Sequence, residues 1–216
     1  MHHIAKCLLL ASLSLTFSSC ATARLPNQGN VKAPIEMQTY RINIADERSW
    51  KDWEASTTAE NDTLVLKKLR KWPLTGEVQG ATIMTVIRNT IASQGWGLTE
   101  TEHADNVRAI EEKIMREKGS VEDGYKLQEL ANGELVRNGK KLYFMTWTAS
   151  QRLEGLPAYR RMSYAKSAMF LYFPEGYKDT HAFYVFVISD SILPPSFMSV
   201  NIEQIYPLID DFEMKE

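Results

Sequence analysis

The chain has 216 residues, with 25 basic and 27 acidic side chains and a net charge of −2 at pH 7. This near-neutral balance excludes the strong basic surface on which nucleic-acid binding depends. Hydrophobic residues make up 44% and aromatic residues 10% of the chain. That content excludes general disorder and is enough for one globular domain with its own core.

Residues 1–19 predict an export signal. One lysine, Lys6, precedes an apolar stretch that runs from Cys7 to Phe17. At about 1.5 Å per residue, a helix of that length is too short to cross a hydrocarbon layer of about 30 Å. A charged head, a short apolar run and a small-residue end are together typical of a secretory signal peptide.

The end of this signal, FSSC at residues 17–20, resembles the lipobox of bacterial lipoproteins, with Phe17 in place of the usual leucine. In that family the cysteine is acylated and becomes the first residue of the mature chain. The resemblance implies lipidation of Cys20 and a lipid anchor in a bacterial cell envelope. Because Ala21 follows the cysteine, it also implies the outer membrane where the host has one. The alternative is cleavage after ATA at residues 21–23, which releases a soluble protein.

The cysteine count favours lipidation. The chain holds two cysteines, and Cys7 lies inside the signal. Cys20 is then the lone cysteine of the exported chain, so no disulfide can form within it. Acylation explains a single thiol in an oxidising compartment.

Residues 20–37 predict a flexible tether, because they carry two prolines, a glycine and no apolar period. A flexible chain of this length has a root-mean-square end-to-end distance of about 20–25 Å. We expect a single globular domain over residues 38–216.

The first half of that domain predicts three strands. Tyr40, Ile42 and Ile44 alternate on one face of the first strand. The polar stretch after it is expected to be irregular, with Trp50 and Trp53 packed on the core. The other two strands are expected at 63–72, where Pro73 ends the strand, and at 80–90, which is rich in Ile, Val and Thr.

A helix is predicted over 99–119. TETE at residues 99–102 fits a capping box, and Val107, Ile110 and Ile114 fall on one face at helical spacing. Gly119 is expected to end the helix.

The second half predicts hairpins. Asn132-Gly133 and Asn138-Gly139 are both typical of type I′ turns, and the second turn joins residues 134–137 to a strand over 140–150. Two nearly continuous apolar strands follow at 159–173 and 181–190, so we expect the sheet to be covered on both faces there. The last prediction is a helix over 200–214, which Pro207 kinks or delays.

This order predicts the α+β class, an antiparallel sheet of about seven strands flanked by helices. In element order it resembles the PsbP-like sandwich over about residues 38–214. The resemblance rests on the helix after three strands, the GELVRNGKKLYF hairpin and the terminal helix. It implies a fold and little about activity.

Motifs for catalysis and metal binding are scarce. The exported chain has two histidines, His103 and His181, neither at ligand spacing, and no nucleophile elbow or P-loop. The adjacent acids Glu111/Glu112 and Asp210/Asp211 predict solvated faces, because neighbours on a helix point in different directions. The basic residues Lys67, Lys68, Arg70 and Lys71 predict either a contact with anionic headgroups or, in the favoured interpretation, the wet side of an edge strand.

We therefore predict no catalytic, cofactor-binding or metal site, and one lipidation site at Cys20. The sequence favours a non-enzymatic envelope lipoprotein, a binding or accessory module that contacts a membrane through its N-terminal lipid and an envelope protein as a possible partner. The alternatives are a secreted or periplasmic hydrolase that uses carboxylates, and a carrier of an apolar ligand between sheet and helix.

Overall fold

The computed structural model describes most of the predicted globular domain. The described residues are 29–30, 34–44, 50, 52–58, 62–90, 125–152, 162–175, 182–193 and 199–215. The signal, Cys20 and the helix predicted over 99–119 lie outside these ranges, so those predictions stay predictions.

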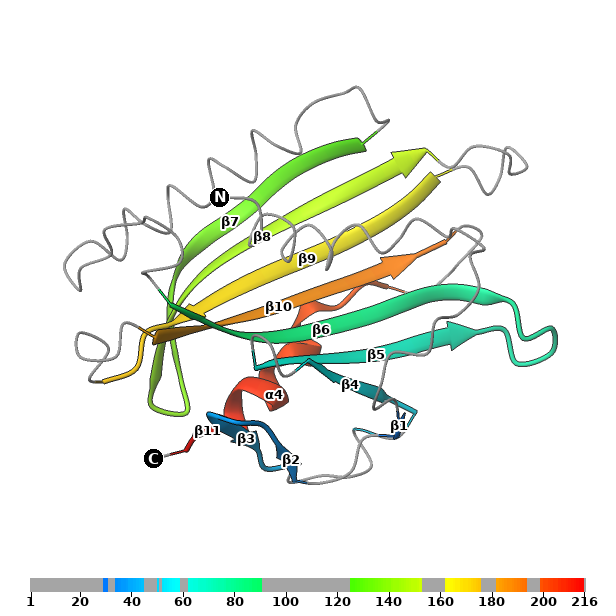
Figure 1. Cartoon of the computed structure of the whole chain (residues 1–216). Coiled ribbons are helices and arrows are strands. Elements are labelled where there is room, and N and C mark those ends of the chain that lie inside the picture. The colour runs from blue at the N-terminus through cyan, green and yellow to red at the C-terminus, as the bar shows by residue number, and fades with distance from the viewer. Residues whose placement is uncertain are drawn as a thin grey trace.

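A long, curved antiparallel sheet dominates the described chain (Figure 1). Its eight strands lie in the order β1-β4-β5-β6-β10-β9-β8-β7, and every neighbouring pair is antiparallel. The strands are β1 (Gly29–Asn30), β4 (Glu54–Thr58), β5 (Thr63–Lys71), β6 (Val78–Thr90), β7 (Tyr125–Arg137), β8 (Lys140–Arg152), β9 (Met162–Tyr172) and β10 (Ala182–Ile192).

A second, three-stranded antiparallel sheet joins the beginning and the end of the described chain. It consists of β2 (Ile35–Glu36), β3 (Tyr40–Ile42) and β11 (Phe212–Met214), with β3 in the middle. Before β11 the chain forms a 3₁₀ turn, η6 (Ile202–Ile205), and one turn of helix, α4 (Tyr206–Asp210). We call residues 199–215 the C-terminal segment.

The C-terminal segment packs against one face of the large sheet. Because side chains alternate along a strand, Tyr184, Phe186 and Ile188 of β10 share that face. The Phe212 ring centroid lies 4.8 Å from that of Tyr184 and 5.1 Å from that of Phe186. The same buried cluster includes Tyr40, Ile42, Trp50, Trp53, Leu64, Leu66, Met84, Val86, Phe170, Ile205, Leu208 and Ile209. Full burial of one such side chain contributes about 1.5–3 kcal/mol.

The predicted strands are largely confirmed. Tyr40, Ile42 and Ile44 are buried together, and Trp50 and Trp53 are buried in the core. The strands expected at 63–72, 80–90, 140–150, 159–173 and 181–190 appear as β5, β6, β8, β9 and β10. Every residue of β10 from Ala182 to Ser191 is buried, so this strand is covered on both faces, as its continuous apolar run predicts.

The α+β prediction, with helices flanking about seven strands as in a PsbP-like sandwich, is wrong for this chain. The described part is a sheet-dominated fold in which α4 is the one α-helix. The helix predicted over 200–214 is broken into η6, α4 and β11. Pro207 delays it, because proline fits only the first turn of a helix, and the pairing of β11 with β3 ends it. The apolar residues that suggested one helix face, Ile205, Ile209 and Phe212, are buried, but they lie in three different elements.

Two more corrections concern short segments between the predicted elements. Residues 54–58, expected to be irregular, form β4, which pairs with the first half of β5. Residues 35–36, placed in the tether by the sequence, form β2, and Ile35 and Met37 are buried. A short polar strand such as β4 gives little periodic signal, since pairing and not burial defines it.

Of the two Asn-Gly pairs, one forms a turn and the other does not. Asn138 and Gly139 have φ of 45° and 75°, and they close the β7–β8 hairpin between Arg137 and Lys140. The turn predicted at Asn132-Gly133 is wrong, because both residues lie inside β7. Gly133 faces Phe144, and a Cβ atom at Gly133 would lie 3.3 Å from the Phe144 ring. The glycine therefore leaves room for an aromatic ring.

We predict that Gly139→Val lowers the free energy of unfolding by about 1–2 kcal/mol, because a β-branched residue resists positive φ. Gly139→Asn is the matched control, since asparagine tolerates this conformation, and it should leave the stability nearly unchanged. Urea denaturation of both variants measures the difference. Equal stability of the two variants would contradict the assignment of this turn.

Candidate functional site

Five of the residues singled out from the sequence lie outside the described ranges. These are Cys20, His103, His181, Glu111 and Glu112. Asp210, Asp211 and the four basic residues of β5 are described. Within the described residues, no group of three or more His, Cys, Asp or Glu side chains is placed to hold a metal ion.

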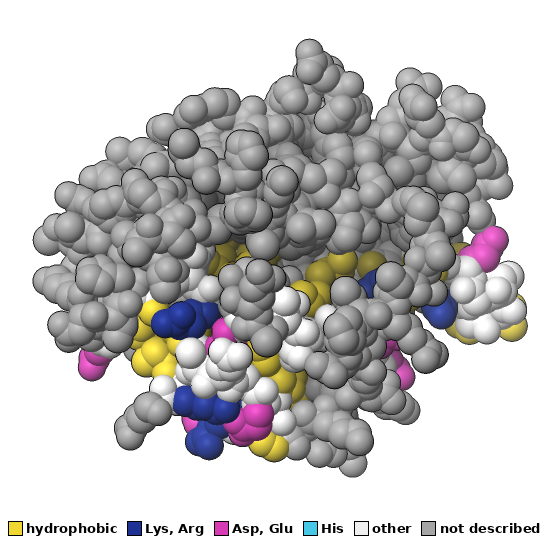
Figure 2. All heavy atoms as spheres, viewed as in Figure 1, with side chains coloured by type: hydrophobic (Ala, Val, Ile, Leu, Met, Phe, Trp, Pro, Cys, Tyr) yellow, Lys and Arg dark blue, Asp and Glu magenta, His cyan; other side chains and the backbone are white. Residues whose placement is uncertain are grey.

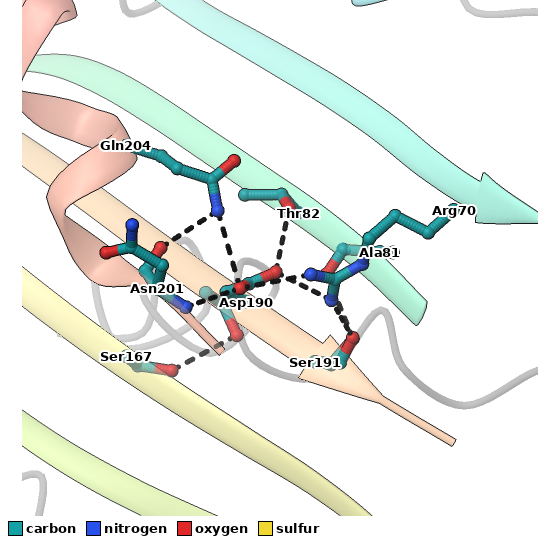
Figure 3. Close-up of polar contacts among 9 residues, drawn as sticks. Arg70, Ala81, Thr82, Ser167, Asp190, Ser191, Asn201 and Gln204 are labelled. Atoms are coloured by element: carbon teal, nitrogen blue, oxygen red, sulfur yellow. Dashed lines mark hydrogen bonds and ion pairs between the residues drawn. The ribbon is translucent and has the colours of Figure 1, made fainter. Parts of the chain in front are cut away.

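The most concentrated polar chemistry in the described chain surrounds Asp190 (Figure 3). Asp190 is 0% exposed and lies near the end of β10. The Thr82 hydroxyl donates to Oδ1 at 2.7 Å, and the backbone N–H of Asn201 donates to Oδ2 at 2.7 Å. The Gln204 amide donates to Oδ2 at 3.4 Å. Three separate elements, β6, β10 and the C-terminal segment, therefore meet at one carboxylate.

Arg70 of β5 neutralises this carboxylate. Its Nη2 lies 2.8 Å from Oδ1 and its Nη1 lies 3.3 Å from Oδ2, a two-pronged contact. Nη2 also donates to the backbone carbonyl of Ser191. Gly80 makes this approach possible, because a Cβ atom there would lie 2.2 Å from the Ser191 carbonyl oxygen and 2.8 Å from Nη2. We call Arg70, Thr82, Asp190, Asn201 and Gln204 the Asp190 cluster.

The Asp190 cluster holds the fold together and offers no free catalytic base. Both carboxylate oxygens already accept hydrogen bonds from protein groups, and the charge is balanced by Arg70. A buried charge without a partner is strongly unfavourable, so these donors are needed for the fold itself. Asn201 is also the cap of η6, since its side chain accepts the Glu203 N–H. The cluster thus positions the start of the C-terminal segment on the sheet.

Arg137 and Asp210 position the other end of that segment. Arg137 Nη2 lies 2.6 Å from Asp210 Oδ2, and its guanidinium carbon lies 4.1 Å from the centroid of the Tyr206 ring. The Asn138 side chain donates to the Asp210 carbonyl at 2.8 Å. Asp210 is therefore only partly solvated, with 31% of its side chain exposed, and its carboxylate joins α4 to the β7–β8 turn.

A second buried carboxylate, Asp62, fixes the small sheet to the large one. It accepts the backbone N–H groups of Gln38 and Thr39, each at 2.8 Å, and the Thr39 hydroxyl. Beside it, burial raises the pKa of Tyr40, and the charge of Asp62 raises it further. Tyr40 therefore stays a neutral phenol, and its role is packing.

The basic run of β5 divides into residues with different roles. The strand β4 pairs only with the first part of β5, through Lys67, so within the described chain the outer edge beyond Lys67 has no partner strand. Lys67 and Lys71 are both exposed, but only Lys71 lies on the unpaired part of the strand, where the edge-strand interpretation applies. Arg70 departs from it, because its side chain is 17% exposed and paired with Asp190. The charge available for anionic headgroups is smaller than the sequence indicates.

The register of β10 marks Asp190 in the sequence, although no motif includes this residue. Tyr184, Phe186, Ile188 and Asp190 occupy alternate positions of one strand, so an acid falls on a face that is otherwise apolar. A charge in that register requires a buried partner. What the register does not reveal is the partner, which lies 120 positions away in β5.

No protein-family model matches the chain, and no curated protein is significantly similar to it in sequence.

We predict that Asp190→Ala lowers the free energy of unfolding by about 3 kcal/mol, since it leaves the Arg70 guanidinium without its counter-charge. Arg70→Met should also destabilise the protein, and the double variant should lose less than the sum of the two. Urea denaturation of the single and double variants measures this coupling.

Glu213→Gln is the control for the Asp190 variants. Glu213 also pairs with an arginine, Arg41, but both side chains are about half exposed, so its replacement should change stability far less. Strict additivity of the Arg70 and Asp190 substitutions would contradict the assignment of one cluster.

Proposed function

We propose that this protein is a lipid-anchored, non-enzymatic binding or accessory module of a bacterial cell envelope. The observation that carries the proposal is FSSC at residues 17–20, directly after a charged head and a short apolar run. Acylation of Cys20 by two or more chains gives stable membrane attachment, whereas a single chain is marginal. By resemblance to lipoprotein sorting, Ala21 after the cysteine favours the outer membrane in a host with two membranes.

The position of β1 supports a domain held close to the membrane. Gly29 and Asn30 already pair with β4, only nine positions after Cys20. Fully extended, that connection spans at most roughly 30 Å. The described part of the chain contains no helix that is both long and apolar enough to cross a bilayer.

The described interior favours a binding role over the two alternatives. A carboxylate hydrolase needs acids that face a substrate, but the buried acids Asp62 and Asp190 are occupied by donors of the fold itself. A carrier of an apolar ligand needs space between sheet and helix. In the described chain that layer contains Phe212 packed against Tyr184 and Phe186.

We predict that the protein expressed with its native signal in a bacterial host partitions into the detergent phase of a Triton X-114 extraction. Cys20→Ser should remove it from that phase, because the acylated residue is lost. Cys7→Ser is the matched control and should partition like the wild type, since Cys7 is cut away with the signal. Mass spectrometry of the mature N-terminus identifies the acylated residue, and a mature chain that begins at Arg24 would refute the anchor.

A further inference from the structure

The loop that joins β5 to β6 presents an apolar tip to the solvent. Leu74 is 98% exposed and Trp72 is 38% exposed, with Pro73 between them. In Figure 1 the hairpin projects past the end of β10, and in Figure 2 it forms the projection at the right of the molecule. We call residues 72–77 the hairpin tip.

The tip has a defined shape. The Trp72 N–H donates to the Glu77 carbonyl at 2.9 Å, and the Gly76 N–H donates to the Trp72 carbonyl at 2.9 Å. Gly76 has a φ of 70°, which glycine adopts freely, and Pro73 fixes its own φ. These contacts close the loop behind Leu74, so the side chain is presented at the apex.

The base of the hairpin is anchored in the sheet. Arg70 is held by Asp190 and by the Ser191 carbonyl, as described above. On the other strand the Gln79 carbonyl accepts the Leu193 N–H at 2.7 Å, next to a register shift between Arg70 and Lys71. A clamped base and a closed loop make the exposure of Leu74 a fixed feature of the surface, unlike that of a frayed chain end.

The charges of the tip favour an apolar partner. Lys71 and Glu77 flank the loop with opposite signs, and the charge of Arg70 is balanced by Asp190. Tryptophan favours the boundary between water and lipid, where its ring is buried and its N–H stays hydrated. At a lipid surface the leucine at the apex would lie in the hydrocarbon, and the tryptophan behind it would lie at the level of the headgroups.

The chain length allows the tip and Cys20 to reach one membrane. Gly29 lies opposite Ala55, which lies opposite Leu66 on β5. From Leu66 to Leu74 the hairpin extends by at most about 25 Å at about 3.3 Å per residue. The nine positions from Cys20 to Gly29 span up to roughly 30 Å, so the lipid on Cys20 can lie in the plane of the tip.

We propose that the hairpin tip is a second membrane contact, in which Leu74 and Trp72 enter the lipid surface that holds the acylated Cys20. The contact is mainly apolar, so it depends little on anionic lipid. It rests on the proposed lipid anchor, and it would fix the orientation of the sheet relative to the membrane. A lipid anchor alone would leave that orientation free.

The test uses the mature acylated protein, reconstituted into vesicles of phosphatidylethanolamine and phosphatidylglycerol. In Leu74→Cys the new cysteine is the one free thiol, because Cys20 is acylated and Cys7 is lost, and it carries an environment-sensitive NBD label. Val136→Cys is the matched control. Val136 is 74% exposed, but β7 is at the far edge of the sheet, and its hairpin turn is at the opposite end from the tip.

We expect a blue shift of the label at position 74 and its quenching by spin-labelled lipids, with neither effect at position 136. Trp72→Ser should reduce the quenching at 74, and vesicles of phosphatidylcholine alone should give a similar shift. Because both labelled positions are exposed, the two proteins should have the same circular dichroism spectrum and melting temperature.

Two results would overturn the inference and leave the proposed lipidation of Cys20 intact. One is a label at 74 that stays as hydrated as the label at 136 while mass spectrometry shows an acylated Cys20. The other is a blue shift that appears only when envelope proteins are added, which would assign the tip to a protein partner. An unacylated Cys20 overturns the proposed function instead, and mass spectrometry separates that case from the others.

Discussion

The carboxylate of Asp190 is a completely buried charge near the end of β10, on a strand face that is otherwise apolar, and the C-terminal segment is arranged around it. A charge in that position is tolerated only with a counter-charge and donors for its oxygens. Arg70, Thr82, Asn201 and Gln204 supply them from two neighbouring strands and from the C-terminal segment. The requirement therefore sets where the chain returns to the sheet after β10.

Asp190 fixes the position of Asn201, and the rest of the C-terminal segment packs along the face of the large sheet. The one-turn helix α4 carries Leu208 and Ile209 into the core, and Arg137 holds its end through Asp210. The strand β11 then pairs with β3, which places Phe212 against the aromatic rings of β10. A single short segment thus closes the core over one face of the large sheet and joins the two sheets.

The same arginine connects the interior to the surface. Because Arg70 is fixed to Asp190 and to the Ser191 carbonyl, the hairpin that begins beside it is rigid at its base. The loop beyond it is closed by its own backbone hydrogen bonds. An exposed leucine is ordinary on a protein surface, but one presented by a clamped and closed hairpin is a candidate contact. The tip and the proposed lipid on Cys20 give the domain two separate points at which it can meet a membrane.

The sequence alone was sufficient for the elements whose signals are local. Alternation identified the strand at Tyr40 and Ile42, the Ile, Val and Thr content identified β6, and nearly continuous apolar runs identified β9 and β10. These signals are local because the order of side chains along a strand follows from which of its faces are buried. Asn138-Gly139 identified its hairpin because few residues tolerate positive φ. The lipobox-like residues at 17–20 are likewise local, and they carry the proposed function.

The tertiary structure decided what depends on partners distant in sequence. Asn132-Gly133 has the same local signal as Asn138-Gly139, but pairing with β8 holds it in a strand, where Gly133 makes room for Phe144. The apolar spacing of residues 202–212 fits a helix, but Pro207 and the pairing with β3 divide it. The sequence predicts Arg70 as one more surface cation, but in the structure it is mostly buried and paired with Asp190. In each case local propensity is worth about 1 kcal/mol or less per residue. Burial of an aromatic ring, or pairing of a charge that is already buried, changes the free energy of folding by several times that amount, so the contacts of the folded chain prevail.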